Sequence, residues 1–140
     1  MEKSDEKLGE ETSPADDGSN AKEDKVLAEK TEQNKRVSDN LGKQIESLTE
    51  TITSSIDNIS LEVKKMDDGG ESASRVQALR TDLHNLDNKI DVVLNGLFSQ
   101  YVCLLEEKEI PAKEATRALF TKNEKSKIAN ILLMLSKKTN

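Results

Sequence analysis

Two runs of apolar residues, spaced mostly three and four positions apart, constrain the fold of this chain more than any other feature. The first run spans residues 41–66 and the second spans 76–104. Only a helix can place residues at such intervals on one face, because side chains alternate between the two faces of a strand. The two stripes are Leu41, Ile45, Leu48, Ile52, Ile56, Ile59, Val63 and Met66, then Val76, Leu79, Leu83, Leu86, Ile90, Val93, Leu97, Tyr101 and Leu104.

These stripe residues are too apolar to remain exposed on isolated helices. Burial of each large aliphatic side chain is worth roughly 1.5–3 kcal/mol. The helices are therefore expected to pair with each other or with another chain, and every stripe residue is a candidate oligomer or partner interface position. A second flank widens the apolar face toward the end of the second run, which favours packing of a third element there. That flank consists of Leu94, Phe98, Val102 and Leu105.

The segment KMDDGGES, residues 65–72, interrupts the two stripes. Paired glycines cost about 1 kcal/mol each inside a helix but suit the position after a helix end. Ser72 or Ser74 can then cap the following helix. The sequence predicts helices over about 23–67 and 73–107 that form an antiparallel hairpin with its corner at Gly69–Gly70. A bent joint between two parallel oligomeric rods is the alternative.

The first part of the chain is predicted to be a disordered acidic tail, residues 1–22. Its first twenty residues contain seven acidic side chains against two lysines, and few large apolar ones. Such a segment cannot bury enough apolar area to offset its ordering entropy. Apolar residues remain sparse up to residue 40, so that stretch is either a frayed helix or a solvated extension.

The last part of the chain, residues 111–138, is predicted to form two short helices. Pro111 suits the first position of a helix and ends the preceding one. Thr121 and Glu124 have the spacing of a capping box that would begin the second short helix. Lys122, Lys125 and Lys127 give this helix a possible basic docking face.

The composition narrows the chemistry that the chain can perform. Hydrophobic and charged residues each make up 34%, and only three residues are aromatic, which favours an all-α fold with long packed helices over a β-sandwich. His84 is the only histidine and Cys103 the only cysteine. His84 is interpreted as a residue flanking the stripe, and Cys103 as partly buried packing. We identify no catalytic residue, metal ligand or cofactor site, and expect no small-molecule substrate.

The N-terminus lacks the apolar core of a signal peptide. The longest apolar run, residues 131–135, is far shorter than the ~20 residues that span a bilayer. A cytoplasmic location is therefore expected, with a nuclear one as the alternative.

Two local patterns resemble known assembly proteins. The stretch Arg80-Thr81-Asp82-Leu83, followed by Leu86 and Ile90, resembles the signature of KxDL-type coiled-coil subunits, with arginine in place of lysine. The layout of an acidic head, a coiled coil and a small helical module is similar to that of viral phosphoproteins. Both resemblances are generic, and neither assigns a family.

The sequence supports two hypotheses about function. The first is a non-enzymatic coiled-coil subunit or adaptor that binds itself or other helical subunits within a complex. The second is an oligomeric phosphoprotein-like cofactor whose basic C-terminal helices dock a polymerase, a nucleoprotein or nucleic acid. Binding of nucleic acid is less favoured than helix pairing, because the basic patch is sparse and lacks stacking aromatics. Docking of the amphipathic C-terminal helix on a membrane surface is similarly less favoured than helix pairing.

Overall fold

The computed structural model describes the backbone of residues 18–139 and the side chains of residue 25 and residues 27–139. Over that range the chain is helical apart from turns and one isolated bridge between Glu71 and Thr139, which confirms the all-α class. The chain divides into two units, residues 1–39 and 40–140. Of the predicted disordered tail, residues 1–17 lie outside the described range.

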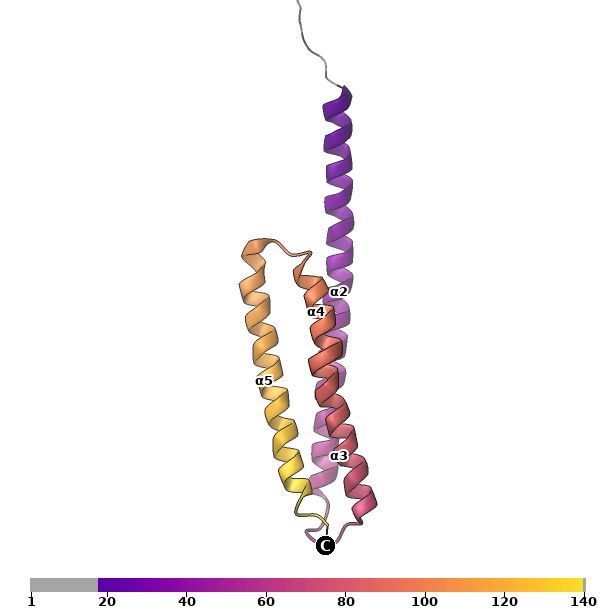
Figure 1. Ribbon diagram of the computed structural model, residues 1–140, viewed down its shortest axis with the longest axis vertical. Helices are drawn as coiled ribbons and strands as arrows, with labels where there is room; N and C mark the ends of the chain where they lie inside the picture. The colour runs from indigo at the N-terminus through magenta and orange to yellow at the C-terminus, as the bar shows by residue number, and fades with distance from the viewer. Residues whose placement is uncertain (1–17, 140) are drawn as a thin grey trace, which may run out of the picture. The chain divides into compact units, whose positions relative to one another are not determined.

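The first helix, α2, spans Gly18–Lys64 and includes residues of both units (Figure 1). It begins before the predicted residue 23, so residues 18–22 are helical. Ser19 and Asn20 are of types that favour helix starts, and the strong helix formers Ala21 to Glu23 follow them. The stretch of residues 23–40, left open by the sequence, is helical throughout.

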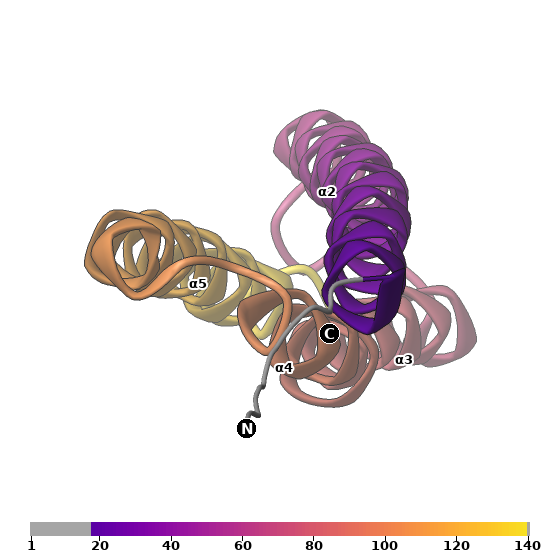
Figure 2. The same cartoon turned by 90° about the horizontal axis from the view of Figure 1, so that it is seen from above.

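The unit of residues 40–139 contains three helical rods, each antiparallel to the one before it in the chain, seen side-on in Figure 1 and end-on in Figure 2. The rods are the C-terminal part of α2, the continuous series α3–η1–α4 over residues 73–102, and α5 (Ile110–Leu135). A single apolar core lies between the three rods. It is formed by Ile52, Ile56, Val63, Met66, Val76, Leu79, Leu83, Leu86, Ile90, Leu94, Ile128, Ile131 and Leu135.

The turn between α2 and α3 (Ala73–Asn88) contains the predicted corner. Gly69 has φ of 72°, a left-handed conformation that glycine adopts without a steric penalty. Ser72 is the N-cap of α3, and its hydroxyl accepts a 3.3 Å hydrogen bond from the backbone N–H of Arg75. Arg75 also joins the two helices, because its guanidinium lies 3.0 Å from the Glu62 carboxylate.

The second rod departs from the uninterrupted α-helix that the sequence predicts over residues 73–107. A π-helical segment, η1 (Lys89–Leu94), joins α3 to α4 (Asn95–Val102). A π turn holds about one residue more than an α turn, so the core-facing position moves on by one residue. The predicted stripe position Val93 is 47% exposed, whereas Leu94 is 1% exposed and takes its place. Phe98, predicted as a flank, is buried after it.

The rod also ends earlier than predicted, at Val102. A 3₁₀ turn, η2 (Glu107–Glu109), precedes α5. There Glu106 and Glu109 form a reciprocal capping box, in which the Glu106 N–H donates to the Glu109 carboxylate at 3.1 Å.

The predicted pair of short C-terminal helices is wrong, since α5 is a single helix of 26 residues. Pro111 lies in its first turn, as predicted. Thr121 does not cap a new helix but lies within α5, and Glu124 is buried beside Lys127 instead of reaching back to residue 121. No glycine or proline follows Pro111 in α5, and the mild helix penalty of threonine and asparagine is too small to break the helix.

Candidate interaction surface

Most of the predicted interface positions lie in the core of the three-rod unit. Ten of the seventeen stripe residues are buried, six are half-buried, and Val93 is exposed. The half-buried ones are Ile45, Leu48, Ile59, Leu97, Tyr101 and Leu104. The buried stripe residues of α2 and α3 therefore contact each other and α5 within one chain.

Two of the three lysines of the predicted basic docking face form ion pairs within the chain. Lys125 forms ion pairs with Asp87 at 3.3 Å and with Asp91 at 2.8 Å. The hydrogen bond to Asp91 is the main cause that raises the pKa of Lys125, against a smaller opposing effect of desolvation. Lys127 lies 3.2 Å from Glu124 and 3.8 Å from Asp57, and Lys122 is exposed. Two of the three lysines thus connect α5 to its neighbours.

A polar cluster on α5 contacts α4 near the end of the unit. The Arg117 guanidinium donates a 2.7 Å hydrogen bond to the Asn95 side-chain oxygen, and it lies 5.1 Å from the centre of the Phe98 ring. Within the described part of the chain, Arg117 Nε and the Thr121 hydroxyl are buried without a hydrogen-bond partner. These contacts join residues far apart in the sequence, and no local motif predicts them.

The end of the described chain closes over the hairpin turn. Lys138 Nζ lies 2.7 Å from the Asp68 carboxylate and donates a 3.1 Å hydrogen bond to the Met66 carbonyl. The N–H groups of Gly69 and Glu71 donate to the carbonyls of residues 137 and 138 at 2.9 and 2.8 Å. The hydrogen bond from Lys138 is the main cause that lowers the pKa of Asp68. We call this arrangement the C-terminal clasp.

The side chains singled out for possible chemistry lie apart from one another. His84 and Cys103 are both exposed, which corrects the expectation that Cys103 is partly buried. Cys103 is the C-cap of α4 and is exposed, whereas its neighbours Val102 and Leu104 are half-buried. Among the described residues, no three His, Cys, Asp or Glu side chains gather in a way that would hold a metal ion. No helix in the described range is long and apolar enough to cross a membrane.

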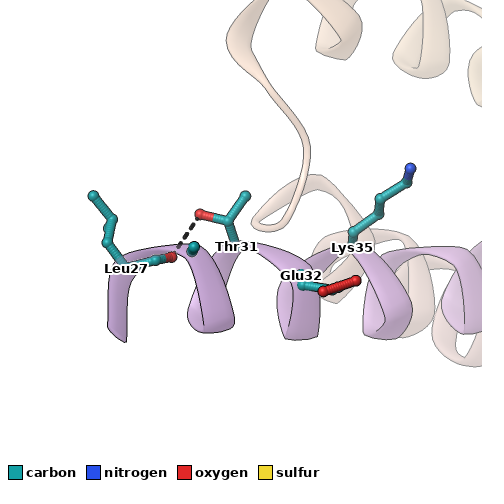
Figure 3. Close-up of a pocket in the computed structure, with 5 residues that line it drawn as sticks. Leu27, Thr31, Glu32 and Lys35 are labelled. Atoms are coloured by element: carbon teal, nitrogen blue, oxygen red, sulfur yellow. Dashed lines mark hydrogen bonds between the residues drawn. The ribbon is translucent and has the colours of Figure 1, made fainter. Parts of the chain in front are cut away.

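The N-terminal segment of α2, residues 18–39, carries exposed apolar side chains. Leu27 is 65% exposed and Val37 is 43% exposed. Figure 3 shows a shallow hollow on this helix lined by Leu27, Ala28, Thr31, Glu32 and Lys35, in which the Thr31 hydroxyl donates to the Leu27 carbonyl at 2.9 Å. Such an open hollow on one helix is too flat to enclose a small molecule.

The exposed residues of this segment continue the spacing of the buried stripe. Leu27, Asn34, Leu41 and Leu48 follow one another at intervals of seven residues, and Val37 lies four residues before Leu41. Along one continuous helix, such a repeat is typical of a face that packs against another helix. Leu41 is buried and Leu48 packs against the core of the three-rod unit, whereas Leu27 and Val37 are exposed.

No family model matches the chain, and no curated protein or solved structure matches it. Over residues 18–139 the fold is an all-α helical bundle, and its first helix, α2, carries exposed apolar residues at heptad spacing.

Proposed function

We propose that this chain is a non-catalytic helical assembly protein, and that residues 18–39 of α2 bind another helix as in a coiled coil. The observation that carries the proposal is the exposure of Leu27 and Val37 in heptad register with the buried stripe. In coiled coils, apolar residues at these positions insert between side chains of a facing helix.

The stability of the segment supports the same proposal. All its described side chains are exposed except Ser38, which is half-buried. A helix of this length without packing is marginal in water, because helix stability in proteins comes mainly from burial of one face. A partner helix that covered Leu27 and Val37 would add roughly 1–2 kcal/mol for each side chain, since part of each is already shielded.

The contacts of the basic residues on α5 make nucleic-acid docking there less favourable than helix pairing by α2. Lys125 and Lys127 hold carboxylates of their own chain, so binding of phosphates there would have to break these pairs. We therefore extend the proposal to helical protein partners or a second copy, acting in assembly or as an adaptor.

The test is affinity capture of the full chain from cells at its native level, followed by quantification of the proteins bound. Leu27→Ser with Val37→Ser would remove the apolar contacts, and Glu32→Ser with Arg36→Ser is a matched control on the polar faces of the same helix. We expect the wild type and the control to retain helical partners or further copies at fixed stoichiometry, and the Leu27/Val37 variant to lose them. Equal retention by both variants would contradict the proposal.

A further inference from the structure

We infer that the helix bound by this segment is the same segment of a second copy, running antiparallel and crossing at the level of Glu32. This inference rests on the proposed function and adds to it the identity and direction of the partner. Three properties of the segment lead to it: its register, its charges and its small apolar area.

The register favours an antiparallel pair. Leu27, Lys30, Asn34 and Val37 follow one another at steps of three, four and three residues, so they occupy alternating core positions of two heptads. In an antiparallel pair the first core position of one helix faces the second core position of the other. With the crossing level at Glu32, each Leu27 packs against Val37 of the second copy. Both exposed apolar residues then become buried together.

The same register places Lys30 opposite Asn34 of the second copy. The amide oxygen of asparagine accepts a hydrogen bond from an ammonium group, so this layer pairs the two polar side chains. A parallel pair would instead bring Lys30 against Lys30, and facing like charges are destabilising. A polar residue at one core position is also the established means by which coiled coils select one register at some cost in stability.

The charges of the whole N-terminal region also favour an antiparallel pair. Residues 18–39 contain five basic and five acidic side chains, so two copies of the segment do not repel each other. The preceding residues 1–17 contain seven acidic side chains and two lysines. A parallel pair would bring two such acidic segments to one end, whereas an antiparallel pair places them at opposite ends.

The apolar area limits the strength of the pair. Among the described side chains of the segment, the large apolar ones are Leu27 and Val37, and two such residues from each copy bury well short of the roughly 1,200 Å² at the low end of stable interfaces. We therefore expect a dissociation constant on the order of 10 µM to 1 mM. Such an association is reversible and depends on local concentration.

Sedimentation equilibrium of the full chain from about 10 µM to about 1 mM tests self-association over that range. We expect a monomer–dimer equilibrium whose dissociation constant rises at least tenfold in Leu27→Ser and in Val37→Ser. Glu32→Ser, on the outward face, should leave it unchanged. Far-UV circular dichroism on each variant separates loss of pairing from loss of the fold.

Disulfide formation under oxidised glutathione tests the direction, in a Cys103→Ser background that removes the native thiol. Leu27→Cys and Val37→Cys chains should form a disulfide-linked dimer when mixed and little of it when each is alone, because residues 27 and 27 are ~15 Å apart along an antiparallel pair.

A monomer at every concentration would overturn the inference. Rapid disulfide formation by Leu27→Cys chains alone would overturn the antiparallel direction. Neither result affects the proposed function, because cellular capture of a different helical protein through Leu27 and Val37 would still support it.

Discussion

Replacing Leu94 by alanine tests the π-helical segment that changes the register of the second rod. Leu94 is 1% exposed and belongs to the apolar core, whereas its neighbour Val93, which the heptad pattern selects, is 47% exposed. A buried leucine-to-alanine change costs about 2–5 kcal/mol, through lost transfer free energy and the cavity left behind. Val93→Ala should cost less than about 0.5 kcal/mol, because half of the side chain is already in water and alanine is the better helix former.

The assay is urea unfolding followed by circular dichroism at 222 nm. With a loss of about 3 kcal/mol and a slope of about 1.5 kcal/mol per molar urea, Leu94→Ala should lower the midpoint by about 2 M. Val93→Ala should leave the midpoint within about 0.3 M of the wild type. Leu94→Val, a milder change, should give an intermediate shift if Leu94→Ala is too unstable to measure. A larger shift for Val93→Ala than for Leu94→Ala would refute the π-helical register and restore the uninterrupted heptad.

Three further predictions concern the turn, the middle of α5 and the clasp. Gly69→Ala should lower the free energy of unfolding by about 1–2 kcal/mol, because Gly69 has positive φ. Gly70→Ala should cost less, because its added Cβ would lie at an ordinary 3.4 Å from Asp67. Equal losses of stability in thermal melts of the two variants would count against the turn geometry. Thr121→Val should raise the melting temperature and stabilise the fold by about 1 kcal/mol, because the change removes a buried hydroxyl without a hydrogen-bond partner in the described structure. If Thr121 capped a helix, the same change would instead be destabilising. Asp68→Asn should lower the melting temperature at neutral pH. Because folding lowers the pKa of Asp68, the stability contributed by its carboxylate is present above the ordinary pKa of 3.8 and is lost as pH falls through the folded pKa. The difference in melting temperature between Asp68→Asn and the wild type should therefore vanish in strong acid. A difference that stays constant into strong acid would argue against the Lys138 contact.

Local signals in the sequence are sufficient for the existence of the first two rods and for the turn between them, but not for the single helix α5. The spacing of the stripes required helices with one buried face, the glycine pair marked the turn, and Ser72 was one of two candidate caps. Each of these features depends on residues within a few positions of one another, where propensity and periodicity act directly.

Features that depend on packing between rods were not predictable in the same way. The π segment adds one residue to a turn, and the choice between Val93 and Leu94 is made by the fit against neighbouring helices rather than by either side chain. Thr121 and Glu124 have the residue types of a capping box, but the same types are tolerated inside a helix when the flanking residues continue it. The carboxylate partners of Lys125 lie 34 and 38 positions away, in a segment that only the folded chain brings close.

The interface prediction was limited for a related reason. A stripe of apolar residues shows that a helix face is buried, but it does not tell whether the covering helix belongs to the same chain. Here most residues of both stripes share one apolar core with the third rod, whereas Leu27 and Val37, which precede the stripes, are exposed. The stripe residues buried in that core contact their own chain, and the spacing of the stripes alone does not reveal this.

Because of the C-terminal clasp, the hydrogen exchange of two backbone amides in the turn between α2 and α3 depends on whether the end of α5 is docked. The N–H groups of Gly69 and Glu71 are bonded to carbonyls that follow α5, not to their own hairpin. Their hydrogen exchange therefore requires the end of α5 to separate from the turn, and the exchange free energy of these two amides measures that opening. Protection at Gly69 and Glu71 would thus distinguish a closed three-rod unit from a hairpin with a detached third rod, without any label on α5 itself.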